Sequence, residues 1–101
     1  MKPIKEVVTR LVNPIVKKRG IVHAKIIFEW DRIVGEKYAS FSRPLKVYFQ
    51  QGQRSQGILH MAVSPSHALL VSHSKDLVID RINTYFGYNA IQDLKIFQQP
   101  I

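Results

Sequence analysis

The stretch "EWDRIVGEKYASFSRPLKV", residues 29–47, decides the fold, because it contains a helix, a stop signal and the entry into a strand. The only tryptophan of the chain stands three and four positions before two aliphatic residues, which is the spacing of a helix face turned towards a core. We therefore predict a helix from about Ala24 to Val34 that ends at Gly35. Its predicted core face is Ile26, Trp30, Ile33 and Val34.

A β-hairpin is predicted after this helix. The run "EKYASFSRP" is expected to add one more helical turn, and Ser42 with Pro44 to set the turn into a strand. The runs 45–50 and 58–64 both alternate apolar and polar side chains, and a glycine-containing loop separates them. This pattern predicts an antiparallel hairpin with one buried face.

A first helix is predicted over residues 4–19, where apolar side chains recur three and four positions apart. Pro14 removes one backbone hydrogen-bond donor, so we expect a kink or break near Asn13. The run "KKRG" then ends the helix, with cations at the negative end of its dipole and Gly20 at the C-cap.

The C-terminal half is predicted to hold helix and then strand. Ser64 and Pro65 begin the helical region, Ser74 begins its second segment and Gly87 ends it. Residues 90–98 form the third strand. The order α-α-β-β-α-β predicts an α+β two-layer sandwich, in which a three-stranded sheet packs on helices in one domain over residues 1–101. The predicted apolar stripe of the last helix is Leu77, Ile79, Ile82 and Phe86.

Positive charge is concentrated in one half of the sequence. The chain has 15 Lys and Arg against 7 Asp and Glu; residues 1–54 hold twelve of these bases and four of the acids, and residues 55–101 hold three of each. The net charge of +8 therefore belongs to the N-terminal half, which favours one basic surface facing nucleic acid or an acidic protein. The simpler interpretation is a solvated face that aids solubility.

The candidate binding residues are two groups of cations. A helix end needs only one or two cations to complement its dipole, so the first group exceeds that need. Contact with about five phosphates of a single strand would give a log–log salt slope near −3.5. An acidic patch on a protein is the leading competitor. The first group is Lys17, Lys18, Arg19 and Lys25, extended by Lys2, Lys5 and Arg10; the second is Lys37, Arg43, Lys46 and Arg54.

Aromatic side chains are a second kind of candidate. Tyr48 and His60 fall on the outward faces of their strands, and Phe97 is a candidate for the same face, interleaved with Lys46 and Lys95. Such a pattern suits base stacking or a protein interface. On sequence alone we favour the simpler reading, in which helices cover this face or a single exposed tyrosine has no role. For Trp30, we likewise favour a core position over a stacking role.

No catalytic or metal-binding pattern stands out. Without cysteine there is no disulfide, thiolate zinc site or cysteine nucleophile. His67 and His73 are six positions apart, and neither an HExxH motif nor a GxSxG motif is present. Asp76 and Asp80 read as exposed helix surface. We expect a cytoplasmic protein, for which association with the nucleoid is an open alternative, that is no enzyme and has no cofactor, metal, membrane partner or small-molecule substrate. The four histidines weighed as ligands are His23, His60, His67 and His73.

Several short motifs, in order along residues 4–98, resemble the DciA family of bacterial proteins that assist loading of the replicative helicase. They are "W" with "IVG", "YASFSRP", "GILHMAVSPSHA" and "LVIDRINTYFGYNAIQDLKIF". The resemblance implies a KH-like fold, contact with the hexameric helicase, and affinity for single-stranded and branched DNA. The residues that carry it as structural signature are Trp30, Val34, Gly35, Pro44, Asn83 and Gly87.

The chain also departs from patterns that the resemblance brings with it. Some longer relatives have a basic C-terminal tail, whereas this sequence ends three residues after Gln98, and the zinc ribbon of others needs cysteines. No glycine lies between Gly57 and Gly87, so the GxxG backbone clamp of nucleic-acid-binding KH domains is missing. Two functions remain open: a helicase adaptor, or a stand-alone module that binds single-stranded DNA or RNA without sequence preference. A domain that acts only within a larger assembly is a weaker third.

Overall fold

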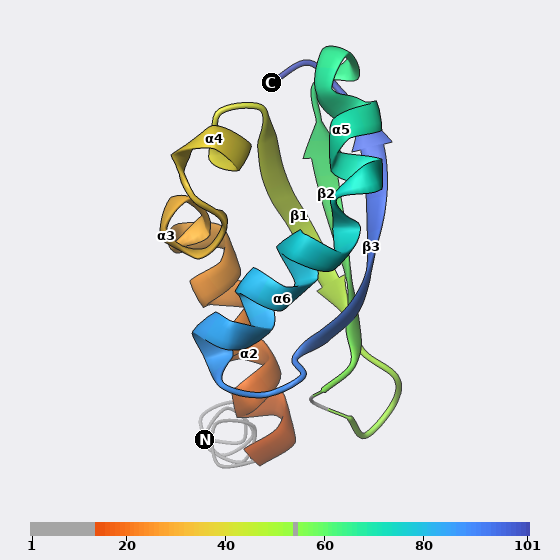
Figure 1. Cartoon of the computed structure of the whole chain (residues 1–101). Coiled ribbons are helices and arrows are strands. Elements are labelled where there is room, and N and C mark those ends of the chain that lie inside the picture. The colour runs from red at the N-terminus through yellow and green to blue at the C-terminus, as the bar shows by residue number, and fades with distance from the viewer. Residues whose placement is uncertain (1–13, 54) are drawn as a thin grey trace, which may run out of the picture.

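The computed structural model describes residues 14–53 and 55–101, which form a helical layer packed on one face of a three-stranded sheet (Figure 1). The expected α+β class and the order α-α-β-β-α-β are confirmed. The second and third helical regions are each divided into shorter pieces. The elements are α2 (Pro14–Phe28), α3 (Trp30–Val34), α4 (Glu36–Ala39), β1 (Ser42–Tyr48), β2 (Gly57–Val63), η1 (Pro65–His67), α5 (Ala68–His73), α6 (Lys75–Phe86) and β3 (Ile91–Gln98).

The strand order in the sheet is β1-β2-β3, with β2 in the centre. β1 and β2 pair in antiparallel fashion, as the predicted hairpin requires. β2 and β3 are parallel, so the chain must cross from one end of the sheet to the other between them. The segment η1, α5 and α6 makes this crossing and covers one face of the sheet (Figure 1). α2 and α3 lie beside it, next to β1.

The core lies between the sheet and the helices. On β2, Leu59, Met61 and Val63 alternate towards the helical layer, and all three are buried. Val78 and Ile82 of α6 pack in the same cluster. Of the predicted stripe of α6, Ile82 is buried, and Ile79 and Phe86 pack against the core. Leu77 is wrong: it is exposed, and its neighbour Val78 is buried in its place.

Gly20 does not end a helix, contrary to the sequence prediction. α2 runs through it from Pro14 to Phe28. Val22 and Ile26, one turn apart beyond the glycine, are both buried, and their burial outweighs the roughly 1 kcal/mol that a helical glycine costs. The predicted helix over 4–19 and its break near Asn13 fall mostly on residues 1–13, outside the described part of the chain.

Ser42 and Pro44 lie inside β1 rather than in a turn before it, so the predicted start of this strand at residue 45 is wrong. β1 is an edge strand, where a proline costs the sheet least. The pairing with β2 shifts between Pro44 and Lys46, which marks a bulge at Leu45. The bulge lets the strand continue past a residue that has no N–H to donate.

Gly57, the first residue of β2, is a position where a single methyl group should matter. An added Cβ would lie 2.8 Å from Cε1 of Phe49 and 2.9 Å from Cγ1 of Val47. We expect Gly57→Ala to lower the free energy of unfolding by about 1–3 kcal/mol through overpacking. Urea denaturation followed by circular dichroism measures the change.

Gly20→Ala is the matched control for this prediction, because nothing lies within 4 Å of a Cβ at that position of α2. Alanine in a helix interior should raise the free energy of unfolding by about 0.5–1 kcal/mol. Equal stability of Gly57→Ala and wild type would contradict the predicted clash.

Candidate nucleic-acid interface

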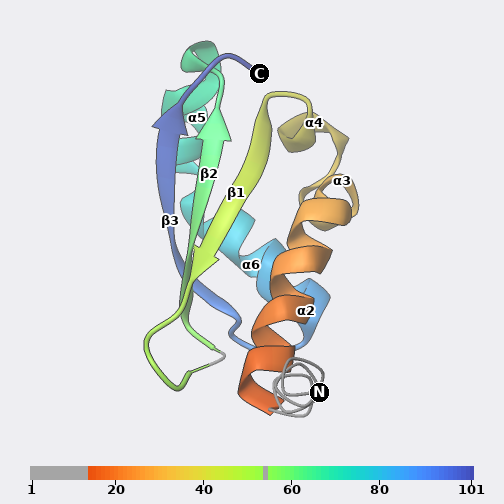
Figure 2. The same ribbon diagram turned by 180° about the vertical axis from the view of Figure 1, so that it is seen from behind.

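One face of the sheet carries no helix. Seen from behind, the three strands lie in front of α5 and α6, and α2 flanks the β1 edge (Figure 2). The pairing register gives the side chains that share this face. We call them the open face: Arg43, Lys46 and Tyr48 of β1; Ile58, His60 and Ala62 of β2; and Asp93, Lys95 and Phe97 of β3.

Three rings cross the open face from one edge strand to the other. The ring centres of Tyr48 and His60 are 4.4 Å apart, and those of His60 and Phe97 are 5.3 Å apart. Both pairs are tilted by about 45° between ring planes. We call Tyr48, His60 and Phe97 the ring row. The expectation that helices cover this face is wrong for the described part of the chain, because Tyr48 is 47% exposed, α5 and α6 pack on the other side of the sheet, and α2 lies beside the β1 edge.

Cations stand at both ends of the ring row. Nζ of Lys46 lies 5.0 Å from the centre of the Tyr48 ring, and Nζ of Lys95 lies 5.6 Å from the centre of the Phe97 ring. Arg43 is also exposed, and it lies two β1–β2 residue pairs beyond the pair of Lys46 and His60. The comparison of charge between the two halves of the sequence did not point to Lys95, because residues 55–101 have no net charge. The alternation along β3 does place its side chain on the outward face.

His60 is the central ring of the row. Its register partners are Lys46 on β1 and Lys95 on β3. Partial burial, and secondly the positive charge of Lys95, hold the pKa of His60 below its ordinary value of 6.5. The imidazole is therefore neutral at pH 7 and presents an uncharged ring between two cation-bearing neighbours.

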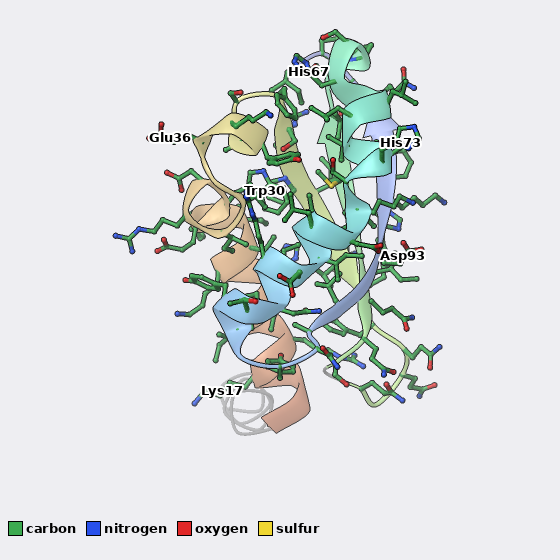
Figure 3. The ribbon with its side chains drawn as sticks, in the orientation of Figure 1. Lys17, Trp30, Glu36, His67, His73 and Asp93 are labelled. Atoms are coloured by element: carbon green, nitrogen blue, oxygen red, sulfur yellow. The ribbon has the colours of Figure 1, made fainter. Side chains whose placement is uncertain are left out.

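The first predicted group of cations does not join the open face. Lys17 and Lys25 are exposed on α2, in the helical layer, and Figure 3 shows Lys17 pointing away near the start of that helix. Arg19 has a different role from the predicted one: Nε donates to the backbone oxygen of Gln53 at 2.6 Å, and Nη2 to that of Gln50. Arg19 therefore links the hairpin loop to α2 through two hydrogen bonds.

Of the second group, Arg43 and Lys46 lie on the open face, whereas Lys37 is exposed on α4. Arg54 lies outside the described residues, as do Lys2, Lys5, Arg10 and the side chain of Lys18. The basic residues that the structure describes therefore lie on separate elements, namely the open face, α2 and α4, and the single basic surface favoured by the charge count is not seen among them.

The histidines do not form a metal site. Within residues 14–53 and 55–101, no three His, Asp or Glu side chains gather as metal ligands would. His67 is the last residue of η1 and His73 the last residue of α5, so the two lie apart (Figure 3). Nδ1 of His67 lies 2.9 Å from the hydroxyl of Ser64, and its ring stacks on Phe41 at 4.1 Å. These contacts explain His67 as part of the packing at the end of β2.

The helical layer exposes apolar side chains and contains a groove. Phe28, at the end of α2, is 81% exposed and follows the exposed Ile27. Leu69 and Leu70 are exposed on α5. A groove of about 540 Å³ between α3 and α6 is lined by Arg32, Ile33, Val34, Gly35, Asp80, Arg81, Thr84 and Tyr85. Exposed Phe and Leu of this kind are typical of protein contacts rather than of phosphate contacts.

The comparisons with known proteins agree with the resemblance read from the motifs. The family model "Dna[CI] antecedent, DciA" matches residues 3–96. The chain belongs to the DciA family. An uncharacterized protein of Rickettsia prowazekii, strain Madrid E, is 30% identical over 98 residues, which cover 95% of this chain and 91% of that relative. Membership of the DciA family supports a role related to DNA replication. In the described part of the chain, no helix has the length and apolar character needed to cross a membrane.

Proposed function

We propose that this DciA-family protein is a non-enzymatic accessory protein of DNA replication, which binds the replicative helicase and helps to place it on single-stranded DNA. The observation that carries the proposal is the family match over residues 3–96. Two further features support it: an open sheet face with cations and rings, and a helical layer with exposed apolar side chains.

The two sides suit two partners. Phosphates pair with exposed Lys and Arg side chains, such as Arg43, Lys46 and Lys95 on the open face. A protein partner would bury apolar side chains such as Phe28, which water now surrounds. An adaptor needs both sides, whereas a module that binds only nucleic acid has no use for the second.

Fluorescence anisotropy with a labelled 20-nucleotide single strand tests this function, with the protein titrated across salt concentrations with and without its cognate helicase. We expect weak binding by the protein alone and a strong increase when helicase is present. If the three open-face cations supply the phosphate contacts, the log–log salt slope of the protein alone is near −2. Tight binding that helicase does not change would contradict the adaptor and favour a stand-alone nucleic-acid-binding module.

Two variants of equal charge change separate the two basic sides. Lys46→Glu/Lys95→Glu alters the open face, and Lys17→Glu/Lys25→Glu alters α2; both change the net charge by −4. We expect the first to weaken binding of the strand at least tenfold and the second to have a much smaller effect. The reverse order would assign the DNA contacts to the helical layer.

A further inference from the structure

We propose that the ring row is a stacking platform for successive bases of a single nucleic-acid strand, whose phosphates the cations of the open face hold. This inference rests on the proposed binding of single-stranded DNA and specifies how the strand is held. It assigns the stacking role to Tyr48, His60 and Phe97 together. It does not involve a GxxG clamp, which the chain lacks.

The first argument is the placement of the rings on adjacent strands. Neighbouring strands lie about 4.8 Å apart, and the ring centres follow that spacing at 4.4 and 5.3 Å. A row across three strands is wide enough to receive two or three bases, as in RNA-binding sheets that use aromatic side chains in this way. Exposed rings without a binding role have no reason to lie next to one another. Here each of the three strands contributes one ring to a continuous row.

The second argument is the position of the charges. Lys46 and Lys95 each lie over the ring of a row member on their own strand, so a base stacked on Tyr48 or Phe97 brings its phosphates close to an ammonium group. Asp93 is the only acidic residue that the register assigns to the open face, and its carboxylate lies 3.9 Å from Nζ of Lys75 on α6, so it turns around the β3 edge towards the helical layer. The face is therefore complementary to a polyanion that also carries flat apolar groups.

The third argument separates a nucleic acid from a protein as the occupant. An apolar protein surface laid on the ring row would remove Arg43, Lys46 and Lys95 from water without giving them a counter-charge, which is costly. A single strand supplies a phosphate for each cation and a base for each ring. Since ring faces accept any base, we expect little sequence preference.

The experiment compares a ten-residue deoxythymidine strand with an abasic strand of the same length, which keeps every phosphate and lacks the bases. We expect the wild-type protein to bind the first strand about 5- to 150-fold more tightly for each base that stacks. Tyr48→Ala/Phe97→Ala should lose this preference, bind both strands alike and keep the salt slope of wild type. A strand carrying 2-aminopurine should show quenching with wild type and none with the double variant.

Two further variants control the experiment. Tyr85→Ala removes an exposed tyrosine of α6, outside the open face, and should leave both affinities unchanged. Cross-strand rings also contribute to sheet stability, so the double variant could fail to fold. Tyr48→Leu/Phe97→Leu then retains apolar contacts, removes the π faces and gives the same loss of preference if the rings stack on bases.

The outcomes distinguish this inference from the function on which it rests. Equal wild-type affinity for both strands, with helicase-dependent DNA binding intact, would overturn the platform and leave the proposed function standing. Loss of helicase binding in Tyr48→Ala/Phe97→Ala without DNA, at unchanged DNA affinity, would make the ring row a protein interface instead. Absence of binding to either strand, with or without helicase, would overturn both.

Discussion

Replacement of Trp30 by alanine is expected to lower the free energy of unfolding by about 3–5 kcal/mol, the largest effect of any single change that we predict. The side chain is 5% exposed and lies between α3 and the sheet (Figure 3). Alanine would leave a cavity where the largest side chain of the chain now packs. A small domain has about 5–15 kcal/mol of stability in total, so the variant should be close to unfolding at 37 °C.

Part of that effect comes from a chain of hydrogen bonds that begins at the indole. Nε1 of Trp30 donates to the hydroxyl of Ser42 at 3.1 Å, and this hydroxyl donates to the backbone oxygen of Tyr38. The two bonds join α3, β1 and α4, three elements that meet within thirteen residues. The Ser42 side chain is buried, and its hydroxyl makes both of these hydrogen bonds, one as acceptor and one as donor.

Trp30→Phe separates the packing from the hydrogen bond, because it keeps an aromatic ring and removes the indole N–H. We expect a loss of about 1–3 kcal/mol, smaller than for alanine. Urea denaturation followed by far-ultraviolet circular dichroism suits both variants, since neither retains tryptophan fluorescence. A cost below 1 kcal/mol for Trp30→Ala would show that the indole is not part of the core.

Helix stops were predictable from the sequence where a glycine adopts a conformation that other residues avoid. Gly35 and Gly87 have φ angles of 88° and 81°, and each follows the last residue of a helix, α3 and α6. Gly20 has the same local signal and no such conformation. What decides between them is whether the apolar face continues: Val22 and Ile26 extend it past Gly20 and lead on to Trp30.

The candidate site was predictable only as separate parts. Alternation along the strands indicated that Tyr48 and His60 point to the same side, and it made Phe97 a candidate. Whether a helix covers that side depends on which face of the sheet the helices pack against. This is a property of the tertiary structure, and no local sequence pattern encodes it. The role of Arg19 was hidden for the same reason, since its partners Gln50 and Gln53 are more than thirty positions away.

The side chain of Asn83 on α6 is hydrogen-bonded to the first residue of β3. Its Nδ2 donates to the backbone oxygen of Ile91, and its Oδ1 accepts from the N–H of the same residue, both at 2.9 Å. Ile91 is the first residue of β3 and is 1% exposed. The side chain thus links the start of β3, the strand that carries Lys95 and Phe97, to α6.

Asn83→Ala should therefore lower the free energy of unfolding by about 2–4 kcal/mol, because it leaves a buried N–H and a buried carbonyl without their partners. Asn83→Asp should also destabilise, since its carboxylate can accept from the N–H of Ile91 but faces the backbone oxygen without a proton to donate. Thr84→Ala, at an exposed neighbouring position, should change stability by less than about 0.5 kcal/mol. Chemical denaturation measures these differences, and hydrogen exchange at the Ile91 amide should accelerate in Asn83→Ala. Unchanged exchange at this amide would mean that the pairing of β3 with β2, and not the Asn83 side chain, fixes the start of β3.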